Sequence, residues 1–329
     1  MPGNRRSRSS SAAATLSPST STREALEDKI QRAEGRTWCD HGFFVGATTD
    51  NAEQLDELEM LPGTPGVKIF MGSSTGTLLV ELDDHLRSVL RHGKRRCPIH
   101  AEDEARLRER KPLAETVHDH PVWRDAEAAR LATERILRLC EETGRPVHVL
   151  HVSTEIELSL LLRAKQQGLP VTCEVTPQHL SLSAPDCYDR LGTFAQMNPP
   201  IRSEEHRQAL WIAVKHGLFD VFGSDHAPHT IEEKQRIYPG SPSGMPGVQT
   251  LLPVLHTWVA KGELTFSRLI AMACENPALL YGIVGKGFLR EGYDADFVLL
   301  DREAKWTVGA AWLQSKCGWS PYLGTDMTG

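Results

Sequence analysis

The sequence predicts an α/β fold, in which a parallel sheet forms an incomplete eight-stranded βα barrel and a remnant of a small β domain follows. Short apolar stretches alternate with amphipathic helical stretches along most of the 329 residues, which is typical of parallel βα units. Polar residues suited to catalysis directly follow several of the apolar stretches. Because active sites of βα barrels lie at the carboxyl ends of the strands, this placement indicates a barrel.

Six apolar stretches have the length and composition of buried strands, and helical stretches separate them. The expected strands are residues 38–48, 66–71, 97–101, 147–152, 171–176 and 218–222. The expected helices are residues 23–34, 51–60, 78–92, 124–143, 155–168, 204–216, 248–261 and 265–276. A closed barrel has eight strands, so two strands are missing from the count, and they would precede Trp38.

The two ends of the chain differ from this βα pattern. Residues 1–21 are rich in Arg, Ser, Ala, Thr and Pro and contain no acidic residue, so we expect a disordered or foreign segment. Residues 22–285 are expected to form the barrel without its first two strands. Residues 287–301 change to a strand-and-turn pattern, and residues 286–329 are therefore expected to form part of a small β domain.

Composition excludes several classes of function. The formal net charge is −6 and there is no basic excess, which argues against nucleic-acid binding. No apolar run approaches the roughly 18 residues that a membrane helix needs. The seven cysteines are scattered and form no Cys-x-x-Cys pair, which argues for a reducing compartment. We therefore expect a cytoplasmic protein that binds neither nucleic acid nor a membrane.

Four side chains with metal-binding potential fall at comparable places on the expected strands. Lys68 lies inside an apolar strand, where an unpaired lysine is costly unless it is modified. His100 and His151 end two strands, and Asp225 follows the last one. A single histidine in an apolar strand is more often a satisfied core residue than a ligand. Two histidines and an aspartate at one barrel mouth nevertheless indicate a divalent-metal site, because zinc binds imidazole nitrogen and carboxylate oxygen.

Five segments of the chain resemble dihydroorotases, a family within the amidohydrolase superfamily. The segments are residues 67–74, 99–102, 148–153, 197–202 and 223–229. The resemblance runs from about Thr22 to the end of the chain. It implies a TIM-type (β/α)8 barrel with a binuclear zinc centre that holds two Zn²⁺ per subunit.

The resemblance also assigns roles to individual residues. It implies that Lys68 is carbamylated and bridges the metals, although some dihydroorotases have an aspartate at that position. It implies that His100 and His151 bind one zinc, and that Asp225 binds the other and is the catalytic acid–base group. The substrate-binding residues that it implies are Asn198, His229, Ser243 and Gly244. The role of His226 stays open.

The activity implied by the resemblance is the reversible hydrolysis of dihydroorotate to N-carbamoyl-L-aspartate in de novo pyrimidine (UMP) biosynthesis. A metal-activated water would attack the ring amide carbonyl, and Asp225 would move a proton to the leaving nitrogen. The resemblance also implies a homodimer or a complex with aspartate transcarbamoylase.

One family feature is absent from the sequence. The chain contains no His-x-His-x-Arg segment, which in the family holds one zinc and the substrate carboxylate. We therefore expect a dihydroorotase that is truncated at its N-terminus and at its C-terminus, with weak metal binding and impaired turnover. The alternatives are a cyclic amidohydrolase of the hydantoinase or allantoinase type and a non-catalytic dihydroorotase-like scaffold for aspartate transcarbamoylase. The segments 197–202 and 225–229 together favour dihydroorotase.

Overall fold

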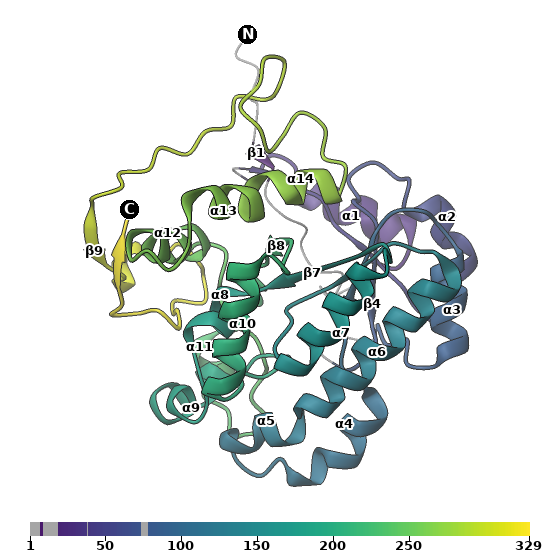
Figure 1. Cartoon of the computed structure of the whole chain (residues 1–329), viewed down its shortest axis with the longest axis horizontal. Coiled ribbons are helices and arrows are strands. Elements are labelled where there is room, and N and C mark those ends of the chain that lie inside the picture. Colours follow the sequence, from purple (N-terminus) through teal and green to yellow (C-terminus); the bar gives the residue numbers. More distant parts are fainter. Residues whose placement is uncertain (1–6, 9–18, 38, 74–77) are drawn as a thin grey trace.

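The computed structural model describes residues 7–8, 19–37, 39–73 and 78–329. Its centre is a six-stranded parallel sheet in the order β3-β4-β5-β6-β7-β8, which confirms the predicted α/β class (Figure 1). The strands are β3 (Val45–Gly46), β4 (Val67–Phe70), β5 (Cys97–His100), β6 (Val147–Val149), β7 (Val171–Val175) and β8 (Val221–Phe222). Strands β3 and β8 form the two edges and are not paired with each other, so the described barrel is not closed.

The strands coincide with apolar stretches because helices cover the sheet, and a parallel sheet is normally buried on both faces. Every residue of β5, β6 and β7 is buried. The register aligns Phe70 with His100 across β4 and β5, and Ile99 with Val149 across β5 and β6. The ends of neighbouring strands therefore lie at about the same height.

The long helices occur where amphipathic stretches were predicted, although several are shorter. They are α1 (Arg23–Ala33), α3 (Asp83–Arg91), α6 (Ala126–Thr143), α7 (Glu155–Gln166), α10 (Glu204–His216) and α12 (Leu251–Ala260). Helices α3, α6, α7 and α10 pack against one another in that succession along the sheet (Figure 1). Local signals explain their ends, because Asp125 caps the start of α6 and Gly144, with a positive φ of 70°, ends it.

Two expected helices are divided or reduced. Residues 51–60 form the 3₁₀ turn η1 (Ala52–Gln54) and α2 (Leu55–Leu58). Residues 265–276 form α13 (Phe266–Ile270) and the π-helical turn η5 (Ala271–Glu275), and α14 (Asn276–Leu280) continues them.

Further short helices lie in the connections between the longer elements, where no helix was expected from the sequence. Each is too short to show a helical period in the sequence. Some of them begin at a capping side chain, such as Asp103 before α4. The short helices are α4 (Glu104–Arg110), α5 (His120–Trp123), α8 (Pro177–Ser181), α9 (Asp186–Leu191) and α11 (Ile231–Lys234), with the 3₁₀ turns η2 (Lys111–Leu113), η3 (Val117–Asp119), η4 (Gly192–Ala195) and η6 (Ala310–Trp312).

The C-terminal region differs from the prediction. Residues 287–301, all of them described, contain no strand, and Phe297 and Leu299 are 67% and 98% exposed. The prediction was wrong because β propensity becomes structure only when a neighbouring strand is available to pair with it. The C-terminal β structure is instead an antiparallel pair, β9 (Lys305–Thr307) with β10 (Asp326–Thr328).

The expectation for residues 1–21 falls largely outside the described residues. Within them, β1 (Ser7–Arg8) pairs in parallel with β2 (Cys39–Asp40). Thr20 is buried and its carbonyl oxygen accepts a hydrogen bond from the Gly46 amide of β3, at 2.7 Å. In the described part of the chain, no helix combines the length and the apolar character that a membrane crossing requires.

Candidate active site

The structure brings His100 and His151 into contact at the carboxyl end of the sheet. His100 is the last residue of β5, and His151 follows β6 by two residues. The Nδ1 atom of His100 lies 3.0 Å from the Nε2 atom of His151, and both rings are buried. Asp225 follows β8 by three residues at the same end, while Lys68 is the second residue of β4.

His151 and Asp225 have strained backbones. Their φ angles are +36° and +41°, and they are the two non-glycine residues with positive φ in the described part of the chain. Such a conformation costs of order 1–3 kcal/mol and persists only where the surroundings enforce it. The strain therefore coincides with two of the four candidate metal ligands.

A buried ion pair holds His100 in one tautomer. The Nε2 atom of His100 lies 2.9 Å from Oε2 of Glu102, and the Arg124 guanidinium pairs with the same carboxylate. Burial alone would raise the pKa of Glu102, but Arg124 and His100 hold that pKa well below its ordinary value. Because Glu102 is ionised and accepts the proton of Nε2, the Nδ1 atom of His100 presents a lone pair to His151.

His151 complements this arrangement. Burial, together with the electrostatic effects of His100 and Lys68, lowers the pKa of His151 well below its ordinary value, so its ring is neutral. Its Nδ1 atom is buried and has no hydrogen-bond partner among the described residues, whereas its Nε2 atom faces His100.

The charge of Lys68 acts on the two histidines and on Asp225. The Nζ atom of Lys68 is 4.6 Å from the centre of the Phe70 ring. Burial lowers the pKa of Lys68, and the carboxylates of Asp225 and Glu174 oppose that shift. Burial also raises the pKa of Asp225 to about 6, with Lys68 acting in the opposite direction.

The donor set fits a zinc ion at the histidine pair. Two imidazole nitrogens bound to one tetrahedral zinc, each at about 2.0–2.1 Å, lie roughly 3.3 Å apart, close to the spacing between His100 and His151. A carboxylate that accepts the outer proton of a ligand histidine, as Glu102 does here, is the usual support of such a site. The chemistry and the spacing of these atoms therefore suit zinc.

Asp225 does not belong to the same tight group. Among the described residues, one set of three or more His, Cys, Asp or Glu side chains has its ligand atoms within 4.8 Å of one another, and it consists of Asp40, Asp294 and Asp296. That set surrounds Lys286, whose Nζ lies 3.0 Å from Asp40 and 2.8 Å from Asp294, so it is an ion-pair cluster. The histidine pair and Asp225 therefore form two separate parts of the candidate site.

The four predicted substrate-binding residues lie on three neighbouring loops. Asn198 is in the loop after η4, and His229 is in the loop between β8 and α11. The loop after α11, here called the second loop, contains Ser243 and Gly244. The Oδ1 atom of Asn198 lies 3.1 Å from Nε2 of His120. His229 faces the second loop, and its Nε2 atom lies 3.2 Å from the carbonyl oxygen of Ser243. The Gly244 amide donates to the Gln196 carbonyl at 2.9 Å, which joins the second loop to the loop of Asn198.

Lys234 holds the loops of Gln196 and Gly244 in place through hydrogen bonds to their backbones. Its buried Nζ atom donates to three backbone carbonyl oxygens, those of Gln196 at 3.0 Å, Pro242 at 2.8 Å and Gly244 at 3.1 Å. Burial lowers the pKa of Lys234 to about 7. Gly244 has a φ of +141°, and a Cβ atom there would overlap with the Ala227 carbonyl oxygen, so the position requires glycine.

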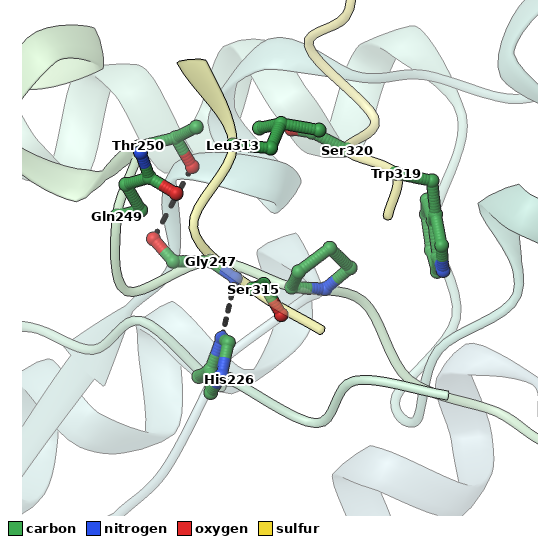
Figure 2. A pocket seen from close by; sticks show the side chains of 9 residues that line it. His226, Gly247, Gln249, Thr250, Leu313, Ser315, Trp319 and Ser320 are labelled. Carbon is green, nitrogen blue, oxygen red and sulfur yellow. Dashed lines mark hydrogen bonds between the residues drawn. The ribbon is translucent and has the colours of Figure 1, made fainter. Parts of the chain in front are cut away.

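His226 anchors the loop that contains Gly247. Its Nδ1 atom accepts a hydrogen bond from the amide of Gly247 at 3.1 Å (Figure 2). It also accepts one from the amide of Val248 at 3.4 Å. The cavity beside it, which Leu313 and Trp319 also line, measures about 10 Å³. That is space for about one water molecule. We therefore assign His226 a role in fixing the loop.

Several residues of the site were not singled out from the sequence. Glu174, a charged residue in the apolar β7, shows the same signal that pointed to Lys68, and its Oε1 accepts from the His151 amide at 3.3 Å. Glu102 lies in a segment that was noted, but its role depends on Arg124, 22 residues away. No local pattern identifies Arg124, His120 or Lys234, because their partners are distant in the sequence.

Comparison with known proteins places these features in one family. Residues 115–318 match the amidohydrolase family. The chain is 36% identical over 323 residues to the dihydroorotase of Methanosarcina mazei, which covers 94% of this chain and 70% of the relative. It is 31% identical over 333 residues to the L-hydantoinase of Paenarthrobacter aurescens, with 95% of this chain and 71% of the relative covered.

Comparison of three-dimensional structures gives a consistent result. The solved L-hydantoinase (dihydropyrimidinase) from Arthrobacter aurescens superposes with a TM-score of 0.90 at 29% identity. The match covers 96% of this chain and 73% of the solved one. The arrangement of strands and helices described above is therefore that of a known barrel type.

Proposed function

This chain belongs to the amidohydrolase family and to its dihydroorotase branch, and on that premise we propose that its site hydrolyses the ring amide of dihydroorotate. The product is N-carbamoyl-L-aspartate, and the reverse reaction closes the ring. The observation that supports this most directly is the buried pair His100–His151 at the carboxyl end of the sheet, with Glu102 behind it.

We propose that His100 and His151 would hold one zinc ion, and that Asp225 and a carbamylated Lys68 would hold a second ion more weakly. When bound, zinc supplies Lewis-acid chemistry, polarising a carbonyl oxygen and lowering the pKa of a water molecule. Support for Lys68 comes from its position, since its charge acts on the histidines and on Asp225 alike. Carbamylation would replace a partly buried ammonium, which repels a metal cation, with a carboxylate, which can bind one.

Asp225 is proposed as the proton-transfer group. In the hydrolytic direction the oxygen of water bonds to the ring carbonyl carbon, the carbon–nitrogen bond breaks, and the ring nitrogen gains a proton. A carboxylate at Asp225 can accept the proton of the water and pass it to that nitrogen. The strained backbone of Asp225, at φ +41°, is consistent with a side chain that must be aimed at one point.

The two joined loops are proposed to orient the substrate ring. Asn198 offers its side-chain amide, and the segment Ser243–Gly244 offers backbone groups. His229 acts on this segment indirectly, because its ring donates to the Ser243 carbonyl. The loop positions are enforced by Lys234, which satisfies three of their carbonyl groups.

A direct test compares three cyclic substrates. The zinc-loaded chain should hydrolyse dihydroorotate with a kcat/KM that exceeds those for hydantoin and allantoin by roughly 10²-fold or more. Asp225→Asn should abolish this activity, while His216→Gln, at an exposed histidine, should leave it unchanged. Failure to hydrolyse or bind any of the three rings would refute the proposal and favour a non-catalytic scaffold.

A second candidate function is supported by specific relatives. The similarity to L-hydantoinases, at 31% identity in sequence and a TM-score of 0.90 in structure, favours a hydantoin-type ring as the alternative substrate. The same assay decides between the two, because hydantoinase activity predicts faster turnover of hydantoin than of dihydroorotate.

The biosynthetic direction has a consequence for partners. Ring closure consumes carbamoyl aspartate, and we propose that the chain acts in de novo pyrimidine synthesis, in a homodimer or together with aspartate transcarbamoylase. Co-purification with that enzyme, followed by size-exclusion chromatography, tests the association.

A further inference from the structure

We propose that His120 is a positioning residue that fixes the direction of the Asn198 side-chain amide, so that Asn198 presents its NH₂ group to the substrate. This inference rests on the proposed function, because it assumes that the loop of Asn198 contacts the substrate ring. It assigns a role to His120, a direction to the Asn198 amide and a hydrogen-bond acceptor to the substrate at this point.

His120 is buried beneath the loop of Asn198. It is the first residue of α5, and its ring packs edge-on against the rings of Trp123 and Tyr238. Its Nε2 atom lies 3.0 Å from the carbonyl oxygen of Met197 and 3.1 Å from Oδ1 of Asn198. Its Nδ1 atom lies 3.3 Å from the hydroxyl oxygen of Tyr238. Both ring nitrogens therefore have partners.

The backbone carbonyl of Met197 decides the tautomer. A carbonyl oxygen only accepts hydrogen bonds, so the Nε2 atom, 3.0 Å away, must bear the proton. The Nδ1 atom is then the acceptor, and the Tyr238 hydroxyl donates to it. Burial lowers the pKa of His120 to about 3, and the positive charge of Arg124 acts in the same direction, so the ring is neutral near pH 7.

The tautomer in turn decides the direction of the Asn198 amide. The atom of Asn198 that faces the Nε2–H group must be an acceptor, and that atom is Oδ1. The reversed amide would place its NH₂ group against the Nε2–H group, donor against donor. The NH₂ group of Asn198 is therefore turned away from His120, and Asn198 itself is only partly buried.

The direction of the amide sets a requirement for the ligand. A side chain that presents NH₂ needs an acceptor, such as the carbonyl oxygen of a cyclic amide or ureide. A ring with an amino group at that position would bring two donors together, which is a costly mismatch. We infer that the Tyr238–His120–Asn198 chain selects a ring carbonyl at this point of the site.

Substitutions of His120 separate positioning from simple space filling. His120→Gln can place an amide NH₂ group near the former Nε2–H and so keep the donor. His120→Phe keeps the ring and its contacts with Trp123 and Tyr238 but has no donor. If His120 positions Asn198, the glutamine variant should bind dihydroorotate within about 3-fold of wild type, and the phenylalanine variant about 10- to 100-fold more weakly.

The opposite order would overturn the inference. A histidine that only fills space should be replaced better by phenylalanine than by glutamine. The dissociation constant is measured by calorimetry on the zinc-loaded chain, so the comparison does not need turnover. His256→Phe is the matched control, since His256 is also buried but its Nδ1 donates to the Thr328 carbonyl oxygen, far along the chain from Asn198, and it should leave the affinity unchanged. Asn198→Asp, which has no NH₂ group, should weaken binding about as much as His120→Phe.

A spectroscopic measurement tests the tautomer without any ligand. In ¹⁵N-histidine-labelled protein at pH 7, the His120 ring, identified by its loss in His120→Gln, should show a protonated Nε2 and an unprotonated Nδ1. A protonated Nδ1 or a doubly protonated ring would overturn the inference. If this signature is present but wild-type protein binds no dihydroorotate, the proposed function has failed and the positioning of Asn198 stands.

Discussion

His179 offers a quantitative test of how the buried polar network responds to acid. Its ring lies beneath the loop that leads to Asn198, with Nδ1 2.8 Å from the Thr176 hydroxyl and Nε2 3.1 Å from the Pro199 carbonyl oxygen. Burial lowers the pKa of His179 to about 4 from an ordinary value of 6.5. The perturbation is a change of pH from 7.5 to 5.0 in metal-free protein.

The sign follows from proton linkage. Between pH 4 and pH 6.5 the unfolded chain binds a proton at residue 179 and the folded protein does not, so acidification favours unfolding. With the two pKa values above, the contribution of His179 lowers the free energy of unfolding by about 2 kcal/mol between pH 7.5 and pH 5.0. Asp225 acts in the opposite sense, because its raised pKa of about 6 lets the folded protein bind a proton first. The wild-type curve alone therefore does not isolate His179.

The comparison with His179→Gln isolates the contribution. Urea unfolding at the two pH values gives the free energy of unfolding by linear extrapolation. Wild type should lose about 2 kcal/mol more than His179→Gln on acidification, because the glutamine does not titrate. His216→Gln, at an exposed histidine, should follow the wild type. Equal losses for wild type and His179→Gln would refute the reasoning.

Three further predictions concern the ion pair, one glycine and the metal. Arg124→Leu should lower the free energy of unfolding by about 3–5 kcal/mol in urea titration, because it leaves the Glu102 charge buried and unpaired; a loss below about 1 kcal/mol would contradict this account of a buried charge. Gly244→Ala should weaken dihydroorotate binding in calorimetry, because the new Cβ atom overlaps the Ala227 carbonyl oxygen and forces the loop to shift. An unchanged affinity would mean that the loop does not contact the ligand. After dialysis, the wild-type chain should retain about one zinc by elemental analysis, and His151→Asn should lose most of it. Two tightly held zinc ions in the wild type would contradict this prediction, because they would require more protein ligands near Asp225 than the described residues provide.

The sheet and the contact between its two histidines could be predicted from sequence because both depend on local pattern. Apolar stretches about five residues long locate strands, and parallel pairing brings their carboxyl ends to one edge of the sheet. His100 and His151, each at such an end, are therefore neighbours although 51 residues separate them. Nothing beyond strand position and pairing order is needed for that inference.

The supports of the site could not be predicted in this way. Glu102 with Arg124 and His120 with Asn198 are pairs 22 and 78 residues apart, and in each pair one partner lies in a short helix or loop without a periodic pattern. Residues 287–301 show a related limit of local sequence patterns, because here a pattern predicted structure that did not form. Their composition favours a strand, but strand formation depends on a partner elsewhere in the structure.

The two parts of the site are held by opposite electrostatic means. Behind the histidine pair, a buried carboxylate is kept ionised by Arg124, and it accepts the proton that would otherwise occupy the outer nitrogen of His100. At the loops proposed to contact the substrate, the buried amine of Lys234 has no carboxylate partner among the described residues and donates instead to three backbone carbonyls. The first arrangement determines which ring nitrogen of His100 is unprotonated and could bind the proposed metal. The second determines where the loop backbone lies. Conservative changes such as Glu102→Gln and Lys234→Met should therefore affect different steps, the former reducing zinc affinity and the latter reducing affinity for the ring.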